Sequence, residues 1–179
     1  MEERRRLAEK VVDPSFLEGM SSMTLDQIRE MRDEARDAET EVSFERRLCQ
    51  ARIDILAAEL KRRSGETEGD LISRLPEILA TEAATPGTSP LPDRAPDFSL
   101  PRNVDIPRRR VEEIMGEQTL ARLPQVPTEE IDGIIDALAE HERNLSARRR
   151  ELHDVMDRIQ SQFISAIRAS HTSSMAPDS

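Results

Sequence analysis

Apolar residues recur at intervals of three and four in two long stretches of the chain, residues 24–65 and 128–170. This spacing puts them on one stripe of an α-helix and is typical of a coiled-coil seam. Nine of the eleven prolines lie between residues 66 and 127, and neither long stretch contains one. Because proline breaks helix interiors, we predict an all-α protein with two long helices and an irregular connection.

Local signals indicate where the first helix begins and ends. Thr24 and Gln27 form a capping-box pattern at its start, and a basic run at 61–63 is followed by Gly65 at its end. Residues 1–23 precede it as an N-terminal segment.

The second helix is predicted to begin at Thr128, where Glu129 and Glu130 complement the positive end of the helix dipole. It is expected to end near residue 170. The polar tail 171–179 that follows is expected to be disordered.

The connection 66–127 is Pro-rich and is expected to be partly disordered. Two amphipathic islands, 70–80 and 108–123, interrupt it as short helices. They could pack on the long helices or dock on a partner. The first helix has a second apolar face, which must be covered either by these islands or by a partner. This face consists of Phe44, Leu48, Ala51 and Ile55.

A polar pattern is repeated in the two helices with spacings of 4, 3, 4 and 4, and in each helix its members share one face. Its first copy is Glu39, Ser43, Arg46, Gln50 and Asp54, and its second is Glu142, Ser146, Arg149, His153 and Asp157. A shift of 103 residues (142 − 39) also superimposes eight apolar pairs, from Ile28 on Ile131 to Leu60 on Phe163. The two helices are therefore an internal duplication.

The orientation of the helices follows from the repeat. If the apolar stripes pack together, a parallel pair sends the two polar patterns to opposite faces, whereas an antiparallel pair brings them to one groove. We therefore predict an antiparallel two-helix coiled-coil hairpin. In it, Arg can bind guanine or phosphate, and the carboxylates can accept guanine N–H donors, so a twofold-symmetric ligand with guanines and phosphates would suit the groove.

Composition narrows the class of protein. Charged residues make up 35% of the chain and aromatic residues 2%, which fits long helices better than a thick core. A net charge of −10 makes direct nucleic-acid binding a poor expectation and suits an acidic surface that masks a basic one. The single Cys49 is expected to be a small core residue in a reducing cytoplasm, and we expect no segment in the membrane.

The repeated pattern Glu-x3-Ser-x2-Arg-x3-Gln-x3-Asp resembles the signature of the RsiG-type anti-sigma factors of actinobacteria. The resemblance implies an antiparallel coiled coil that binds two associated molecules of cyclic di-GMP through both copies of the pattern. It also implies that the loaded protein sequesters WhiG, a sporulation sigma factor of the flagellar type, and so represses its transcription. The ligand role carries to all ten residues of the two copies, although His153 departs from the Gln of the signature.

Two other readings are open at this point. The chain could be a structural coiled-coil adaptor that binds no ligand, with the polar pattern as a solvated face. An enzyme is not expected, because no Gly-rich phosphate loop, nucleophile elbow or paired Glu-x-x-His metal motif occurs. We therefore expect neither catalytic residues nor a metal site.

Overall fold

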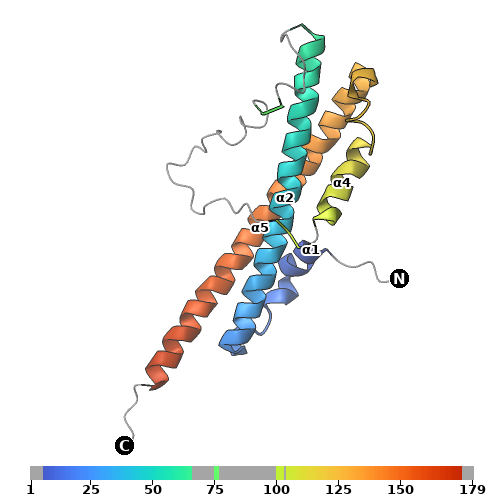
Figure 1. The fold of residues 1–179 in the computed structure, drawn as a ribbon. Helices are drawn as coiled ribbons and strands as arrows, with labels where there is room; N and C mark the ends of the chain where they lie inside the picture. Colours follow the sequence, from blue (N-terminus) through green and yellow to red (C-terminus); the bar gives the residue numbers. More distant parts are fainter. Residues whose placement is uncertain (1–5, 66–74, 77–99, 103, 175–179) are drawn as a thin grey trace, which may run out of the picture. The chain divides into compact units, whose positions relative to one another are not determined.

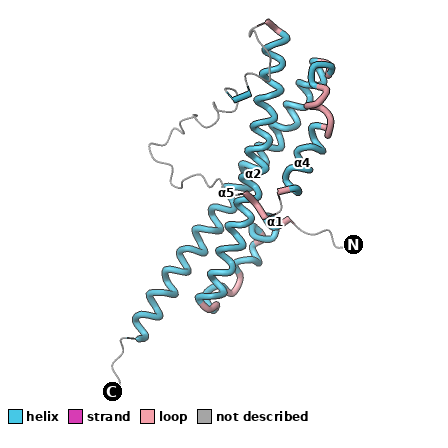
Figure 2. The backbone as a smooth tube through the Cα atoms, viewed as in Figure 1, coloured by secondary structure: helices cyan, strands magenta, loops and turns pink. Residues whose placement is uncertain are grey.

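The computed structural model describes residues 6–65, 75–76, 100–102 and 104–174, and this part of the chain is helical without any strand. The elements in chain order are α1 (Leu7–Val12), the 3-10 turns η1 (Pro14–Leu17) and η2 (Met20–Ser22), α2 (Leu25–Arg63), α4 (Asp105–Met115), the 3-10 turn η3 (Leu123–Gln125) and α5 (Thr128–Ser174) (Figures 1 and 2). None of the helices described here combines the length and the apolar character that crossing a bilayer requires.

The start of α2 has the predicted capping box. The backbone N–H of Thr24 donates to Gln27 Oε1 at 2.8 Å, and the backbone N–H of Gln27 donates to Thr24 Oγ1 at 3.3 Å. At the other end, Gly65 has a φ of 78°, a left-handed conformation that only glycine adopts without strain. The helix therefore lies within the predicted range 24–65.

Helix α5 begins at the predicted residue, Thr128, but continues to Ser174. The expectation that the disordered tail starts at residue 171 is wrong for 171–174, while 175–179 lie outside the described residues. Residues 171–174 contain no helix breaker, and the next proline is Pro177, so nothing in the sequence stops the helix at residue 170.

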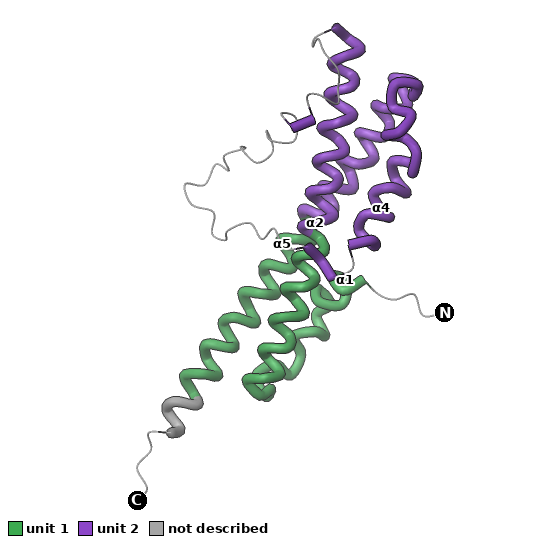
Figure 3. The backbone as a smooth tube through the Cα atoms, viewed as in Figure 1, with its two compact units in different colours: residues 1–42, 147–179 green, residues 43–146 purple. Residues whose placement is uncertain are grey.

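The chain forms two compact units, unit 1 (residues 1–42 and 147–179) and unit 2 (residues 43–146) (Figure 3). Helices α2 and α5 contribute a segment to each. In unit 1 the guanidinium carbon of Arg29 lies 5.6 Å from the centre of the Phe163 ring, and Arg149 Nε lies 2.9 Å from Glu39 Oε1. The residue number on α5 thus falls as the number on α2 rises, so the pair is antiparallel.

Unit 2 has the same direction. His141 Nε2 lies 2.7 Å from Glu45 Oε1, and Arg63 Nη1 donates to Thr128 Oγ1 at 3.3 Å. The predicted fold class, all-α with two long antiparallel helices, is confirmed.

The apolar seam of each long helix repeats every seven residues. Its buried members are Ile28, Ala35, Val42, Cys49 and Leu56 on α2, and Ile131, Leu138, Leu145, Leu152 and Ile159 on α5. These are five of the eight apolar pairs that the 103-residue shift predicted. The other three pairs are partly exposed at the edge of the seam. Burial raises the pKa of the Cys49 thiol to about 12, with further contributions from the charges of Glu45 and Glu142, so Cys49 is a core residue as predicted.

In unit 1 the N-terminal segment folds onto α2. Ala8 and Val11 of α1 are buried, and Lys10 forms an ion pair with Glu34 of α2. We made no prediction for these elements, because a helix of six residues, such as α1, is too short to show an apolar period.

In unit 2 one of the two amphipathic islands lies against the hairpin. Val111 and Met115 of α4 and the following Leu123 are buried, so the island predicted at 108–123 packs within its own chain. Its helix begins three residues earlier than the island, at Asp105. Apart from residues 75–76, the island at 70–80 lies outside the described residues.

A buried carboxylate attaches α4 to both long helices. Glu45 on α2 is 1% exposed; its Oε2 accepts a hydrogen bond from Arg110 Nη1 of α4 at 2.8 Å, and its Oε1 contacts His141 of α5 at 2.7 Å. Burial by itself would raise the pKa of Glu45, but the hydrogen bond with His141 and the charge and hydrogen bond of Arg110 leave that pKa lowered. The ionised carboxylate therefore holds three helices together.

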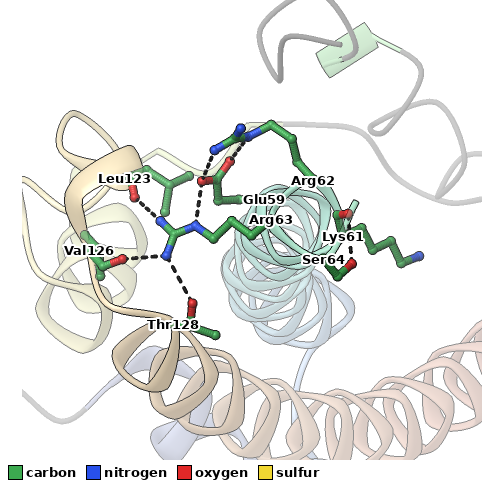
Figure 4. A network of polar contacts seen from close by, with 8 residues as sticks. All are labelled: Glu59, Lys61, Arg62, Arg63, Ser64, Leu123, Val126 and Thr128. Atoms are coloured by element: carbon green, nitrogen blue, oxygen red, sulfur yellow. Dashed lines mark hydrogen bonds and ion pairs between the residues drawn. The ribbon is translucent and has the colours of Figure 1, made fainter. Parts of the chain in front are cut away.

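A second buried carboxylate, Glu59, holds the end of α2. Its Oε1 accepts hydrogen bonds from Arg63 Nε at 2.8 Å and from Arg62 Nη2 at 2.9 Å. The Arg62 Nε donates to its Oε2 at 2.8 Å. Both oxygens are therefore satisfied although the residue is buried (Figure 4).

The guanidinium of Arg63 extends this network to the segment that leads into α5. It donates to the carbonyl oxygens of Leu123 and Val126, each at 2.7 Å, as well as to the Thr128 hydroxyl (Figure 4). One side chain thus connects the last turn of α2 to η3 and to the first turn of α5.

Arg110→Ala should lower the free energy of unfolding by about 2–3 kcal/mol, because it leaves the buried Glu45 with one partner fewer. Arg108→Ala is the matched control on the same helix. Arg108 and Asp105 are exposed and Glu112 is half-buried, so the loss of these ion pairs should cost less than about 0.5 kcal/mol. Urea unfolding measures both values. Equal costs for the two variants would contradict the role assigned to Glu45.

Glu59 should make the stability dependent on pH. Its pKa is lowered from 4.5 to about 2, first by the hydrogen bonds of Arg62 and then, against the opposing effect of burial, by those of Arg63. A lowered folded-state pKa gives stabilisation that is complete above about pH 4.5 and is lost as the pH falls towards 2. The difference in unfolding free energy between the wild type and Glu59→Gln should therefore shrink from neutral pH to pH about 3. Glu140→Gln, an exposed control, should show no such trend; a constant difference for Glu59→Gln would refute the assignment.

Candidate functional site

The ten residues of the duplicated pattern lie on α2 and α5, and the structure brings members of the two copies together in each unit. Unit 1 contains Glu39, Arg149, His153 and Asp157, which we call the unit 1 cluster. Unit 2 contains Ser43, Arg46, Gln50, Asp54, Glu142 and Ser146, which we call the unit 2 cluster.

The unit 1 cluster is centred on Glu39. Its Oε1 accepts a hydrogen bond from Arg149 Nε at 2.9 Å and lies 3.3 Å from His153 Nε2. The Glu39 side chain is 10% exposed, whereas that of Arg149 is 35% exposed. The carboxylate therefore lies inside the cluster, and the guanidinium also reaches solvent.

The unit 2 cluster has the same arrangement around Glu142. Its Oε1 accepts hydrogen bonds from Gln50 Nε2 at 3.3 Å and from Ser146 Oγ at 2.8 Å. Arg46 Nε lies 3.6 Å away, which is an ion pair without a hydrogen bond. This pair is looser than the one in unit 1.

In both clusters, residues of one copy of the pattern pair with residues of the other copy in the same way. In each, the Glu of one copy contacts the Arg of the other copy and the residue four positions after that Arg, which is Gln50 in unit 2 and His153 in unit 1. This reciprocity is the relation that an antiparallel packing of two repeats produces. A helix face that was merely solvated would not pair the same positions twice.

The two aspartates of the pattern differ in their surroundings. Asp54 Oδ2 is buried without a hydrogen-bond partner among the described residues, and burial raises the pKa of this carboxyl, with Lys61 acting in the opposite direction. Asp157 is exposed. Asp54 thus has an unused acceptor atom, which a hydrogen-bond donor of a ligand could satisfy.

Sequence reasoning missed the buried carboxylates Glu45 and Glu59, because charged residues are read as surface unless a partner is known. A signal was present. Glu45, Arg52 and Glu59 recur every seven residues, each three positions after a member of the apolar seam, and Arg52 Nε is also buried without a partner among the described residues. Such a spacing predicts a face that is covered by another element.

A cavity of about 600 Å³ lies between the end of α2 and the start of α5, but it is lined by none of the ten predicted residues. Among the described residues, no group of three His, Cys, Asp or Glu side chains could hold a metal ion.

The two Glu–Arg pairs should differ in strength. A double-mutant cycle on Glu39 and Arg149 should give a coupling free energy of about 1 kcal/mol, because the pair is hydrogen-bonded and its carboxylate is buried. The cycle on Glu142 and Arg46 should give about half of that or less, since the atoms are farther apart. Thermal unfolding of the single and double alanine variants measures both. A stronger coupling in unit 2 would contradict the geometry described above.

Comparison with known proteins finds a family that matches part of the chain. Residues 14–79 match the RsiG-like family, and this segment contains the whole of α2 with the first copy of the polar pattern. No curated protein matches the chain closely enough to serve as a relative. The family indicates an anti-sigma-factor type of role, with a sigma factor as the general kind of partner. The match supports the resemblance seen in the repeated pattern over residues 14–79, and this segment of the chain is RsiG-like.

Proposed function

We propose that this protein is an anti-sigma factor that binds cyclic di-GMP through the duplicated pattern. When loaded, it sequesters a sigma factor of the flagellar type, as WhiG is, and keeps it from RNA polymerase. The protein acts in the cytoplasm, by binding, and carries out no reaction of its own.

The reciprocal pairing of the two copies is the observation that carries this proposal. Arg149 contacts Glu39 in unit 1, and Arg46 contacts Glu142 in unit 2, so each cluster needs both helices. A ligand that binds these residues therefore binds the packed helices and not the separated ones. By linkage, it stabilises the packed form according to its concentration relative to its dissociation constant.

The chemistry of the clusters suits a guanine nucleotide with phosphodiesters. A guanidinium can hold guanine N7 and O6 or pair with a phosphate oxygen. When a phosphate pairs with Arg149 or Arg46, the carboxylate that had paired with that arginine, Glu39 or Glu142, can accept hydrogen bonds from N1–H and N2–H2 of guanine. The ion pairs within the clusters thus keep each group charged and in position until the ligand exchanges with it.

Asp54 adds a further acceptor to the unit 2 cluster. Its Oδ2 is buried and has no hydrogen-bond partner within the described part of the chain, and a guanine N–H could supply one. This supports a ligand that brings hydrogen-bond donors as well as negative charge. Inorganic phosphate or a simple anion would bring only the charge.

The acidic character of the chain suits the second half of the proposal. A net charge of −10 favours association with a basic protein surface over association with nucleic acid. A sigma factor that presents its basic DNA-binding surface is a partner of that kind. The ligand acts on this interaction by fixing the two long helices against each other.

Arg46→Ala and Arg149→Ala should each weaken cyclic di-GMP binding by at least tenfold, because each removes a charged contact worth on the order of 2–3 kcal/mol. Isothermal titration calorimetry measures the affinity, and circular dichroism should show unchanged helicity. Arg158→Ala is the matched control, since Arg158 is an exposed arginine on α5 outside the pattern. Wild-type affinity in both cluster variants would refute the binding site.

The second measurement is complex formation with a WhiG-type sigma factor. Size-exclusion chromatography with and without cyclic di-GMP detects the complex. We expect a complex with the wild type only when the nucleotide is present, and none with Arg149→Ala. A complex of equal stability without nucleotide would instead support a coiled-coil adaptor that needs no ligand.

A further inference from the structure

Each cluster has a central glutamate that contacts an arginine of the other copy and a side chain four positions after that arginine, and the type of this last side chain differs between the clusters. Gln50 lies 3.3 Å from Glu142 in unit 2, and His153 lies 3.3 Å from Glu39 in unit 1. The two side chains occupy equivalent places and make equivalent contacts. They differ in one property, because an imidazole can take up a proton near neutral pH and an amide cannot.

A protonated His153 would change the charge balance of the unit 1 cluster. It would place a second positive charge beside Glu39, which then needs Arg149 less as a partner. Arg149, which reaches solvent, would be freer to contact an anion. Both effects favour the binding of a ligand that carries phosphates.

We propose that His153 makes ligand binding at the unit 1 cluster depend on pH, so that the affinity for an anionic nucleotide rises as the pH falls through the neutral range. This inference rests on the proposed function and concerns the regulation of the same site. The unit 2 cluster, with Gln50 in the equivalent place, lacks this dependence.

The direction follows from linkage. Without ligand, the imidazole lies beside the carboxylate of Glu39. A bound nucleotide adds phosphate charge to the same cluster, and additional negative charge favours the protonated imidazole. The complex therefore takes up a proton, and its affinity must increase as protons become more available.

The other charged groups near His153 ordinarily keep their charge in this range. On α5, helical spacing places Arg149 and Arg150 one turn before it and Asp157 one turn after it, and Asp154 is its neighbour in sequence. From α2, the cluster contains Glu39, with Arg36 one turn before it. Carboxylates and guanidinium groups do not ordinarily titrate between pH 6 and 8, whereas imidazoles do.

His141 does not provide an equivalent effect. It contacts Glu45 in unit 2, whose other oxygen is held by Arg110, and none of these three residues belongs to the duplicated pattern. His141 therefore serves as an internal control, because it is present in every variant used below.

The test is the affinity for cyclic di-GMP at pH about 8 and about 6, measured by calorimetry with the full chain in buffers of different ionisation enthalpy. For one linked proton the affinity changes by at most tenfold per pH unit, and we expect the wild type to bind about three- to tenfold more tightly at the lower pH. The buffer series should show proton uptake on binding.

Two variants test whether the imidazole causes the pH dependence, one by removing it from the unit 1 cluster and one by adding it to the unit 2 cluster. His153→Gln, which restores the repeated pattern, should bind with nearly the same affinity at both pH values and without proton uptake. Gln50→His, which places an imidazole in the unit 2 cluster, should show a steeper dependence than the wild type.

The outcomes separate this inference from the function on which it rests. A pH dependence in His153→Gln equal to that of the wild type, or none in the wild type, overturns the role of His153 and leaves the binding site intact. If the folded wild type binds no cyclic di-GMP at either pH, both the proposed function and this inference are wrong.

Discussion

A narrow apolar seam that recurs every seven residues is the constraint on which the rest of the structure depends. It runs along α2 and α5, and its members on α2 include the small residues Ala35 and Cys49. Small side chains contribute less transfer free energy than Ile or Leu, so the seam is weaker where they lie than at Ile28 or Leu56. The polar contacts beside the seam therefore add to the packing of the helices where the seam is narrow.

Those polar contacts are of two kinds with different consequences. Glu45 and Glu59 are buried, fully partnered and joined to α4, η3 and the start of α5, so they define unit 2 as a three-helix arrangement. The clusters of the duplicated pattern keep guanidinium groups partly in solvent. Ion pairs at such places are weak, and their groups can exchange one partner for another at little cost. The same chemical groups thus give rigidity where they are buried and responsiveness where they reach water.

Much of this could be predicted from the sequence, because it depends on short-range regularities. The capping box at Thr24, the glycine after α2 and the proline distribution fixed the long helices, and the duplicated pattern, combined with the seam, gave their antiparallel direction. The reciprocal contacts of Glu39 and Glu142 follow from the same symmetry. The predictions of the two helices and of their direction succeeded because helix period and repeat register are properties of the local sequence.

The packing of α4 and α1 could not be predicted in the same way. Glu45 is covered because it contacts Arg110 and His141, and these residues lie 65 and 96 positions away in the chain. A lone glutamate among many charged residues gives no sign of such partners. The end of α5 was also misjudged, since a polar composition weakens the expectation of a helix but does not stop one before Pro177.

The burial of Cys49 has a consequence for the chemistry of the whole chain. Its thiol lies in the seam, close enough to Glu45 and Glu142 for their charges to raise its pKa, and its fraction of thiolate at neutral pH is correspondingly minute. Since the thiolate is the form that reacts with oxidants and alkylating agents, the folded protein is protected at its single cysteine. Modification of this sulfur becomes fast only when the seam around it opens, so the rate of thiol labelling reports how often unit 2 comes apart.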